Sequence, residues 1–335
     1  MKAMWMVRAG RGGLYAGEFQ SQGYVGIGWT ALGDPTAVRD KRVLVEKSAK
    51  IWPDATEQSR FVGASIVFRF VNEIAVSDSV VTYDPATRLY LLGTVTGEPT
   101  WRDDDEDARS TQRQVHWTGS VPRDALSSSA RNSLGAVQTL FLIPRQVAAE
   151  LVAISRGSAP AKVVQEAADE AIAGSLPDAF AGLEEQAVER IKDRIVKLDW
   201  EEMQDLVAAL LRAMGYRTSI SARGPDRGRD ILATPDGFGF KPPRIIVEVK
   251  HRPNQTMGAP EVRAMPVGRQ ADDRGLFVST GGFSREAYYE AEHGKVPIAL
   301  MTLDDLTRAI IDAYPQFDDD GRALLPLRRL YWPIT

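Results

Sequence analysis

Arg244-Ile-Ile-Val-Glu-Val-Lys250 is the stretch that decides the fold of the C-terminal half of this sequence. In an extended strand successive side chains point to opposite faces, so Ile246, Glu248 and Lys250 share one face and the aliphatic residues between them share the other. A charged pair on an otherwise aliphatic strand is costly to bury unless it is paired or binds a metal ion. We therefore expect Glu248 and Lys250 to project together from this strand toward a chemical site.

Three further apolar stretches surround this strand. Residues 229–234 are expected to form the preceding strand, and Asp236-Gly237 marks a turn between the two. Gly275–Thr280 and Val296–Thr302 are expected strands, each followed by a helical pattern. Strands separated by helices indicate an α/β domain with a central mixed sheet flanked by helices.

A helix is expected before these strands, from Asp199 to Gly215. Asp199 can cap its N-terminus, with Glu202 three residues later as the second half of a capping box. The apolar residues that recur at helical spacing are Trp200, Met203, Val207, Leu210, Leu211 and Met214. The glycine that follows is a typical helix end, so the α/β pattern begins at about residue 198.

The charged residues near the central strand fit the chemistry of phosphodiester hydrolysis. Asp230 opens the preceding strand and can approach the face of Glu248 and Lys250. Two carboxylates can hold divalent cations that neutralise a scissile phosphate and lower the pKa of an attacking water. The lysine can orient or deprotonate that water, or stabilise charge in the transition state. A Glu-x-Lys triplet alone would fit a solvated edge strand equally well, and the spaced aspartate favours a nuclease.

Residues 199 to about 311 resemble the Mrr-type restriction endonuclease domain, a branch of the PD-(D/E)xK nucleases. Four blocks in order carry the resemblance: Leu211-Arg-Ala-Met-Gly-Tyr216, Gly224-Pro-Asp-Arg-Gly-Arg-Asp230, Glu248-Val-Lys250 and Phe277-Val-Ser-Thr-Gly-Gly-Phe-Ser284. The resemblance implies that Asp230 and Glu248 are metal ligands and that Lys250 is the catalytic lysine. It also implies Mg²⁺ or Mn²⁺ as the cofactor.

One position departs from this family. Members commonly carry a glutamate on the first helix, at the position that aligns with Gln204. The amide carbonyl of Gln204 can still bind a metal or a water, although it is neutral, and a purely structural role on the margin of the buried face is equally compatible with the pattern. Ser279 and Thr280 can hold a DNA phosphate or simply cap the next helix.

The first 145 residues are expected to be mostly β. Short apolar runs are separated by Gly, Asp and Pro turn signals. The runs expected to form strands are Tyr24–Trp29, Ser65–Val71, Ser79–Tyr83 and Tyr90–Val95. Five of the seven tryptophans fall in this part of the chain. From about residue 146 to residue 197 alanine, glutamate and lysine become frequent, which indicates a helical linker.

The N-terminal part also resembles a known class, the PUA/EVE-like domains that read modified bases. Met4–Gly10 and Gly23–Trp29 carry this resemblance, which implies a small, strongly bent β-barrel with a pocket. Such a pocket would stack an extruded base between aromatic faces. The aromatic candidates are Tyr24, Trp29 and Trp117, although tryptophans in a small barrel are commonly core residues. Arg8 and Arg11 are candidates for phosphate contacts, or belong to a glycine-rich surface loop.

Composition sets limits on the class of protein. The chain has 335 residues, a net charge of −4, no cysteine and three histidines, which excludes disulfides and thiolate zinc sites and favours a hard cation. No apolar stretch reaches membrane-spanning length and no leader is evident, so a cytoplasmic location without membrane contact is expected. Between residues 215 and 275 eleven Lys and Arg stand against seven Asp and Glu. This local positive charge fits either phosphate contacts or an ordinary solvated surface.

The expected organisation is a reader at 1–145, a helical linker at 146–197, a nuclease at 198–314 and a C-terminal tail at 315–335. Together these parts predict a type IV-like, modification-dependent restriction endonuclease of an antiviral defence system. It would cut double-stranded DNA that carries methylated or hydroxymethylated cytosine, and it would act as a homodimer. The alternatives are a repair or structure-specific nuclease on unmodified DNA and a non-catalytic DNA-binding protein.

Overall fold

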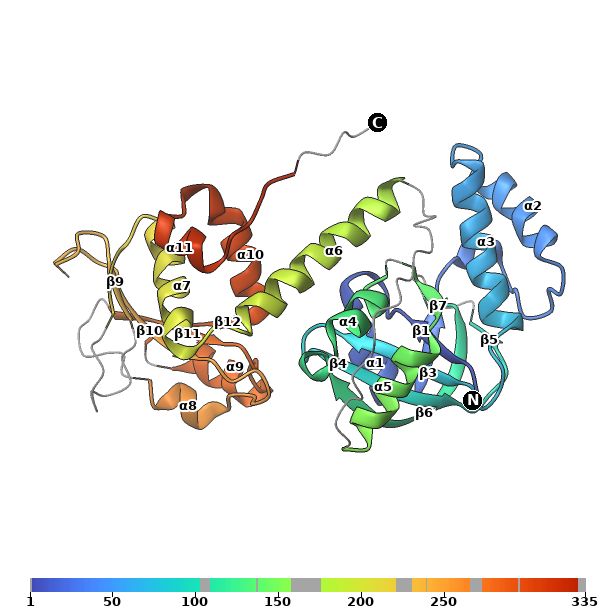
Figure 1. Ribbon diagram of the computed structural model, residues 1–335, viewed down its shortest axis with the longest axis horizontal. Coiled ribbons are helices and arrows are strands. Elements are labelled where there is room, and N and C mark those ends of the chain that lie inside the picture. Colours follow the sequence, from blue (N-terminus) through green and yellow to red (C-terminus); the bar gives the residue numbers. More distant parts are fainter. Residues whose placement is uncertain are drawn as a thin grey trace. The chain divides into compact units, whose positions relative to one another are not determined.

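The protein divides into two compact units, Met1–Gln186 and Ala187–Thr335 (Figure 1). The computed structural model describes residues 2–102, 109–136, 138–157, 176–220, 231–238, 240–265, 273–294 and 296–330. Among these residues, no helix combines the length and the apolar character that crossing a membrane requires. Each unit has its own hydrophobic cores.

The N-terminal unit is built on one sheet. Its described strands are β1 (Met4–Val7), β2 (Tyr24–Ile27), β3 (Ser79–Asp84), β4 (Leu89–Val95), β5 (Thr100–Trp101), β6 (Thr111–Pro122) and β7 (Leu140–Leu142). The order is β2-β6-β4-β3-β1-β7, and β5 pairs with β6 beside this path. The β1–β3 pair is parallel, whereas the other described pairs are antiparallel.

Strand β6 bends this sheet. Its first residues, from Thr111 to Gln114, pair with β2, whereas the rest of the strand pairs with β4. A register shift between Leu92 and Gly93 places an extra residue of β6 in the ladder, which increases local twist. A bent sheet agrees with part of the sequence-based expectation. In the described pairings, however, the path runs from β2 to β7 and no ladder joins these two ends.

Helices make the N-terminal unit a mixed α/β structure, so the mostly-β expectation is too narrow. The described helices are α1 (Ala16–Gln22), α2 (Lys41–Ile51), α3 (Glu57–Asn72), α4 (Ser128–Leu134) and α5 (Arg145–Ser155), with short 3-10 turns at Arg11–Gly13, Thr30–Leu32 and Arg123–Ala125. The strand expected at Ser65–Val71 is wrong, because these residues belong to α3. The hydroxyl of Thr56 accepts a hydrogen bond from the Ser59 N–H and starts this helix, whose buried residues recur at helical spacing.

The C-terminal unit contains the mixed sheet expected from the sequence. Its described strands are β8 (Arg217–Ile220), β9 (Ile231–Thr234), β10 (Arg244–Lys250), β11 (Asp273–Ser279) and β12 (Ile298–Thr302), in the order β12-β11-β10-β9-β8. Strands β10, β11 and β12 are parallel, whereas β8, β9 and β10 are antiparallel. The expected strands near residues 229–234, 244–250, 275–280 and 296–302 are thus confirmed within their described parts.

Helices cover both faces of this sheet. The described helices are α6 (Leu176–Ile195), whose first residues belong to the other unit, α7 (Trp200–Ala213), α8 (Ala259–Arg263), α9 (Arg285–His293), α10 (Leu303–Ala313) and α11 (Asp319–Leu324), with a 3-10 turn at Tyr314–Gln316. Residues of α6, α7 and α10 form one core with Val247, Val249, Leu276 and Val278 of the sheet. Residues of α8 and α9 form a second core around Phe277, which lies on the opposite face.

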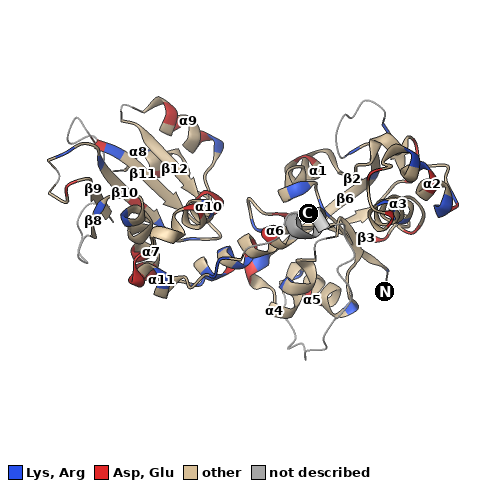
Figure 2. Ribbon diagram, turned by 90° about the horizontal axis from the view of Figure 1, so that it is seen from above, with Lys and Arg blue, Asp and Glu red and all other residues tan. Residues whose placement is uncertain are grey.

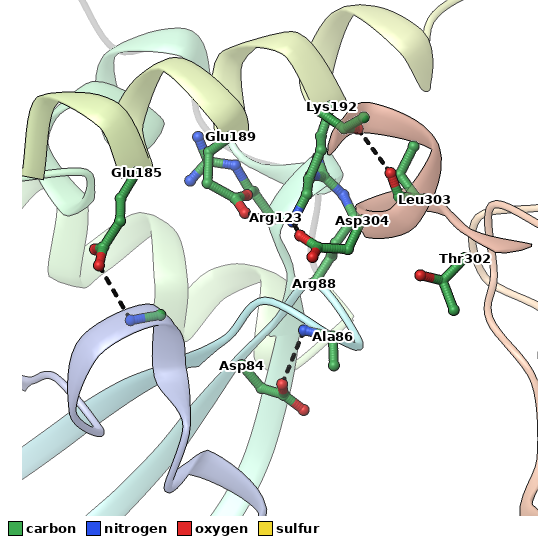
Figure 3. A network of polar contacts seen from close by, with 12 residues as sticks. Asp84, Ala86, Arg88, Arg123, Glu185, Glu189, Lys192, Thr302, Leu303 and Asp304 are labelled. Atoms are coloured by element: carbon green, nitrogen blue, oxygen red, sulfur yellow. Dashed lines mark hydrogen bonds and ion pairs between the residues drawn. The ribbon is translucent and has the colours of Figure 1, made fainter. Parts of the chain in front are cut away.

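A buried lysine joins two helices of the C-terminal unit. The side chain of Lys192 in α6 is 2% exposed, and its ammonium contacts Glu189 at 3.0 Å and Asp304 at 2.5 Å (Figure 3). Asp304 lies at the start of α10 and also contacts Arg308 at 2.7 Å. Because a buried ammonium needs charged partners, this cluster fixes α6 against α10.

Candidate active site

Glu248 and Lys250 lie near the carboxyl end of β10, where a parallel neighbour, β11, also ends. The ladder pairs Glu248 with Phe277 and Lys250 with Ser279. Because Phe277 belongs to the core under α8 and α9, Glu248 and Lys250 project from that face of the sheet. This arrangement confirms the predicted alternation along the strand. Ligand sites in sheets of this kind commonly lie at the carboxyl ends of parallel strands.

The two charged side chains form an ion pair between Lys250 Nζ and Glu248 Oε1. The Glu248 side chain is 9% exposed and the Lys250 side chain 32% exposed. The carboxylate is therefore largely removed from water, while the ammonium reaches the surface. In this state the lysine compensates the charge of the buried carboxylate.

A tight turn forms the neighbouring wall of this site. The N–H of Thr280 donates to the backbone oxygen of Lys250 at 3.1 Å, and the hydroxyl of Ser279 donates to the backbone oxygen of Gly282 at 3.2 Å. A Cβ added at Gly281 would lie 2.1 Å from the backbone oxygen of Gln255. Only glycine fits there, because the chain after β10 passes directly against it.

Ser284, and not Ser279 or Thr280, caps the helix that follows this turn. The Ser284 hydroxyl accepts from the N–H of Ala287 at 3.3 Å. Ser279 and Thr280 are 0% and 5% exposed. Of the two interpretations of Ser279 and Thr280, the capping of helix α9 is therefore wrong, and a contact with a DNA phosphate stays a prediction.

His251 connects the end of β10 to the start of helix α7. Its Nε2 lies 2.9 Å from the backbone oxygen of Leu198, so Nε2 donates in this contact. Asp199, which follows Leu198 in the sequence, caps α7 and forms the predicted capping box with Glu202, with both hydrogen bonds at 2.9 Å. The capping role expected for Glu202 is thus confirmed. The hydrogen bond brings the start of the helix that carries Gln204 close to the end of the strand that carries Lys250.

Gln204 is 4% exposed and lies in the second turn of α7. Its neighbour Met203 belongs to the core on the opposite face of the sheet from Glu248. Two other residues of the expected apolar face differ from the sequence prediction, since Trp200 is 48% and Met214 58% exposed. Trp200 is the first residue of the helix and Met214 is its C-cap, so both stand at its ends.

Asp230 lies outside the described residues, as does the loop 221–230 that precedes it. In the described part of the chain no group of three or more His, Cys, Asp or Glu side chains is placed to hold a metal ion. Glu248 supplies one carboxylate, the type of oxygen ligand that Mg²⁺ and Mn²⁺ accept. The donor set present here therefore fits a hard cation if a second oxygen ligand joins it.

The three aromatic candidates of the N-terminal unit all contact the same core. Tyr24 is 3% exposed, and its hydroxyl donates to Glu18 at 2.6 Å. The indole N–H of Trp117 donates to the backbone oxygen of Phe19 at 2.7 Å. Trp29 is half-buried and packs on α3 where a Cβ at Gly63 would lie 2.8 Å from its Nε1.

The two arginine candidates differ in their surroundings. Arg8 forms an ion pair with Glu185 at 2.8 Å and donates to the backbone oxygen of Gly135 at 3.3 Å. Arg11 is exposed in the turn that follows β1, and the neighbouring Gly12 N–H donates to Glu185 at 3.1 Å. Glu185 therefore already engages the side chain of Arg8, whereas Arg11 stands at the surface.

A polar cluster beside Tyr24 was not found from the sequence. Glu18 forms an ion pair with Arg109, whose guanidinium lies 4.6 Å from the ring centroid of Tyr15. Glu18 and Arg109 are separated by 91 residues. No spacing rule connects positions so far apart, and only the fold brings them together.

The comparisons with known families give one match in each half of the chain. Residues 195–310 match the family described as "Restriction endonuclease". Residues 8–142 match a "Domain of unknown function (DUF8426)". The first match covers the strand with Glu248 and Lys250 and the helix with Gln204. The C-terminal unit therefore contains a restriction endonuclease domain, as the sequence resemblance predicted.

Similar proteins extend this comparison. An uncharacterized protein, y4cE of Sinorhizobium fredii, is 28% identical over 116 residues, which are 34% of this chain and 29% of that protein. The alignment thus spans less than a third of this relative. The modification-dependent restriction endonuclease AspBHI gives a TM-score of 0.32 at 15% identity, covering 90% of this chain and 87% of that one. MspJI restriction endonuclease, in complex with a 27-mer oligonucleotide, gives a TM-score of 0.28 at 15% identity, covering 90% of this chain and 73% of that one.

Proposed function

We propose, from the restriction endonuclease domain at residues 195–310, that this chain hydrolyses phosphodiester bonds in DNA with the help of Mg²⁺ or Mn²⁺. The observation that carries the proposal is the pair formed by Glu248 and Lys250 at the carboxyl end of β10. A buried carboxylate beside a partly exposed ammonium provides both a cation ligand and a positive group that reaches an incoming phosphate.

In this proposal Glu248 and Asp230 hold the metal. The antiparallel ladder pairs Ile231 with Val247, and Asp230 directly precedes Ile231 in the sequence. The support for assigning both as ligands is the resemblance of this part of the sequence to the Mrr-type nucleases, together with the restriction endonuclease match at residues 195–310. A bound divalent cation supplies charge neutralisation at the scissile phosphate and a more acidic water.

Lys250 has two roles in this mechanism. Before DNA binds, it neutralises Glu248, and in the complex its ammonium orients the attacking water and stabilises negative charge on the phosphate. The buried Gln204 is a candidate to bind a metal or a water through its carbonyl oxygen.

The proposed substrate is double-stranded DNA with methylated or hydroxymethylated cytosine, selected by the N-terminal unit. The support is the resemblance of its first strands to PUA/EVE-like readers and the bend at β6, which suits a barrel around a pocket. Trp29 and Trp117 are half-buried and can offer one ring face to a base, whereas Tyr24 would support them from the core. Cutting both strands requires two active sites, so we propose a homodimer.

Cleavage of matched plasmids tests the function. The full chain with Mg²⁺ or Mn²⁺ should cut a cytosine-methylated plasmid and leave its unmodified counterpart intact. Equal cutting of both plasmids would favour a repair or structure-specific nuclease, and no cutting with either metal would favour a non-catalytic DNA-binding protein.

Substitutions in the domain test the site. Asp230→Ala, Glu248→Gln and Lys250→Ala should each abolish cleavage while DNA binding remains. Asp312→Asn serves as a matched control, because this exposed acid lies on α10 of the same unit. Cleavage by any of the three site variants at the wild-type rate would refute the assignment of that residue.

A further inference from the structure

The loop that joins β9 to β10 presents two phenylalanines to solvent. Phe238 is 80% exposed and Phe240 86% exposed, more than any other large hydrophobic residue in the described part of the chain. Their rings stack, with centroids 6.2 Å apart and planes inclined by 19°. Each ring would remove on the order of 150–250 Å² from water if it were covered. Such a pair indicates a contact with another molecule.

The described residues of this loop are held by hydrogen bonds within the loop. The carboxylate of Asp236 accepts from the N–H groups of Phe238 and Phe240 at 3.1 Å and from that of Lys241 at 2.9 Å. The hydroxyl of Thr234 accepts a further hydrogen bond from the N–H of Gly237 at 3.1 Å. Because the backbone N–H groups of both phenylalanines are already hydrogen-bonded, little ordering of these two residues is required when the rings bind.

Basic side chains flank the two rings. Arg217, at the start of β8, is exposed and lies under the turn, since a Cβ at Gly237 would be 3.2 Å from the Cβ of Arg217. Lys241 is exposed in the loop itself, and the exposed Arg274 of β11 pairs with Ile245 at the same end of the sheet. Figure 2 shows basic residues along the β8–β9 side of this unit. Cations around an apolar tip suit a polyanion with an apolar interior.

We propose that Phe238 and Phe240 form a wedge that inserts at a base step of duplex DNA, with Arg217 and Lys241 on the flanking phosphates. This inference rests on the proposed nuclease function and adds a contact away from the catalytic residues. One or two apolar side chains are enough to unstack a base step and bend the duplex.

A second copy of the chain fits the two rings less well. Together they offer roughly 400 Å², whereas each partner in a stable protein interface contributes about 800 Å². DNA also accounts for the flanking cations, because its backbone carries a phosphate on both sides of every base step.

The wedge and the catalytic pair are separated by the length of β10. The loop precedes Arg244, and Lys250 ends the strand. Six residue steps at about 3.3 Å give roughly 20 Å. This length corresponds to about six base pairs at about 3.4 Å each. A duplex held at Lys250 is therefore long enough to reach the rings, and the unstacked step should lie several base pairs from the cut.

Fluorescence of 2-aminopurine tests the wedge. The wild-type chain and the variant Phe238→Ser/Phe240→Ser are titrated, in EDTA to prevent cleavage, into duplexes that carry one 2-aminopurine at successive positions. The wild type should increase the emission at one step, and the variant should lose this increase and bind at least tenfold more weakly. Tyr289→Ser is the matched control, because Tyr289 is a 64% exposed aromatic residue on α9 of the same unit, and its affinity should stay within twofold.

Two results would overturn the wedge. The first is a double variant that is folded, as shown by circular dichroism, and that binds and unstacks DNA as the wild type does. The second is a double variant whose mass by light scattering falls from dimer to monomer, which would assign the rings to a second copy. Failure of the proposed nuclease would instead show as a wild type that cuts no DNA with Mg²⁺ or Mn²⁺, a measurement independent of the titrations in EDTA.

Discussion

Replacing Lys250 by methionine should tighten the binding of a divalent cation while abolishing DNA cleavage. A cation at Glu248 competes with the ammonium that already pairs with this carboxylate. The Glu248 side chain is 9% exposed and the Lys250 side chain 32% exposed, so the pair is intermediate between an exposed and a buried ion pair. An exposed ion pair contributes about 0–1 kcal/mol to stability, and breaking a buried one costs about 3–5 kcal/mol. We expect a gain of about 1–2 kcal/mol in metal binding, or roughly five- to thirty-fold in Kd.

Calorimetric titration of the DNA-free chain with Mn²⁺ measures this change. Lys250→Arg keeps the positive charge and should bind Mn²⁺ nearly as the wild type does. Lys241→Met removes an exposed lysine before the same strand and should leave the affinity unchanged. A folded Lys250→Met protein that binds Mn²⁺ no more tightly than the wild type would show that the ammonium does not compete for a cation at Glu248. The assignment of this carboxylate as a ligand would then be refuted.

Three further predictions concern the framework around the site. Lys192→Met should destabilise the C-terminal unit by about 2–3 kcal/mol in urea unfolding, because it leaves the carboxylates of Glu189 and Asp304 without the ammonium between them. As the control, Arg308→Met removes an exposed partner of Asp304 and should cost less than about 1 kcal/mol. Gly281→Ala should lower the Tm and the cleavage rate, since its Cβ would meet two backbone oxygens at 2.1 and 2.4 Å. Gly258→Ala, whose nearest contacts are 3.4 Å away, should do neither. Burial raises the pKa of Asp304, but hydrogen bonds from Arg308 and Lys192 outweigh it and hold the pKa below 3.8. This carboxylate therefore stabilises the fold above about pH 4 and the contribution is lost as pH falls through the lowered pKa, which urea unfolding at pH 3 and pH 7 measures.

Local rules predicted the elements that carry the chemistry. The alternation along β10 placed Glu248 and Lys250 on one face, because strand geometry allows no other arrangement once the aliphatic residues are buried. The capping box at Asp199 and Glu202 was equally local, since its hydrogen bonds span three residues. The order of strands in the C-terminal sheet was beyond such rules, although its mixed character followed from the alternation of helices and strands.

Non-local packing explains what the sequence did not show. Ser65–Val71 has the composition of a strand, but it is the second half of a helix that begins at the cap Thr56 and packs on the N-terminal core. Lys192 and Asp304 stand in different helices and pair only when the unit has folded. Phe238 and Phe240 would be expected in a core from their apolar character, and only the structure shows that they are exposed.

The aromatic residues of the N-terminal unit illustrate the same limit. The sequence makes Tyr24 and Trp117 candidates for stacking on a base, yet composition cannot distinguish a ring that supports a core from one that lines a pocket. In the structure Tyr24 is buried beside Phe19, with ring centroids 4.9 Å apart, and Trp117 is tied to a backbone oxygen by its indole N–H. The cluster of Glu18, Arg109 and Tyr15 next to them depends on contacts that no local pattern encodes.

Substitutions can affect the two units separately, because each unit has its own hydrophobic cores. The cores around Phe19 and Leu151 contain residues of the N-terminal unit, and the cores around Val247 and Phe277 contain residues of the C-terminal unit. A substitution at Trp29 or Trp117 that alters the choice of DNA should leave the ion pair at Glu248 intact. We expect such a variant to cut DNA but no longer to distinguish modified from unmodified DNA. A variant at Glu248 or Lys250 should still distinguish them in binding but should not cut. These two outcomes would assign substrate choice and hydrolysis to different parts of the chain.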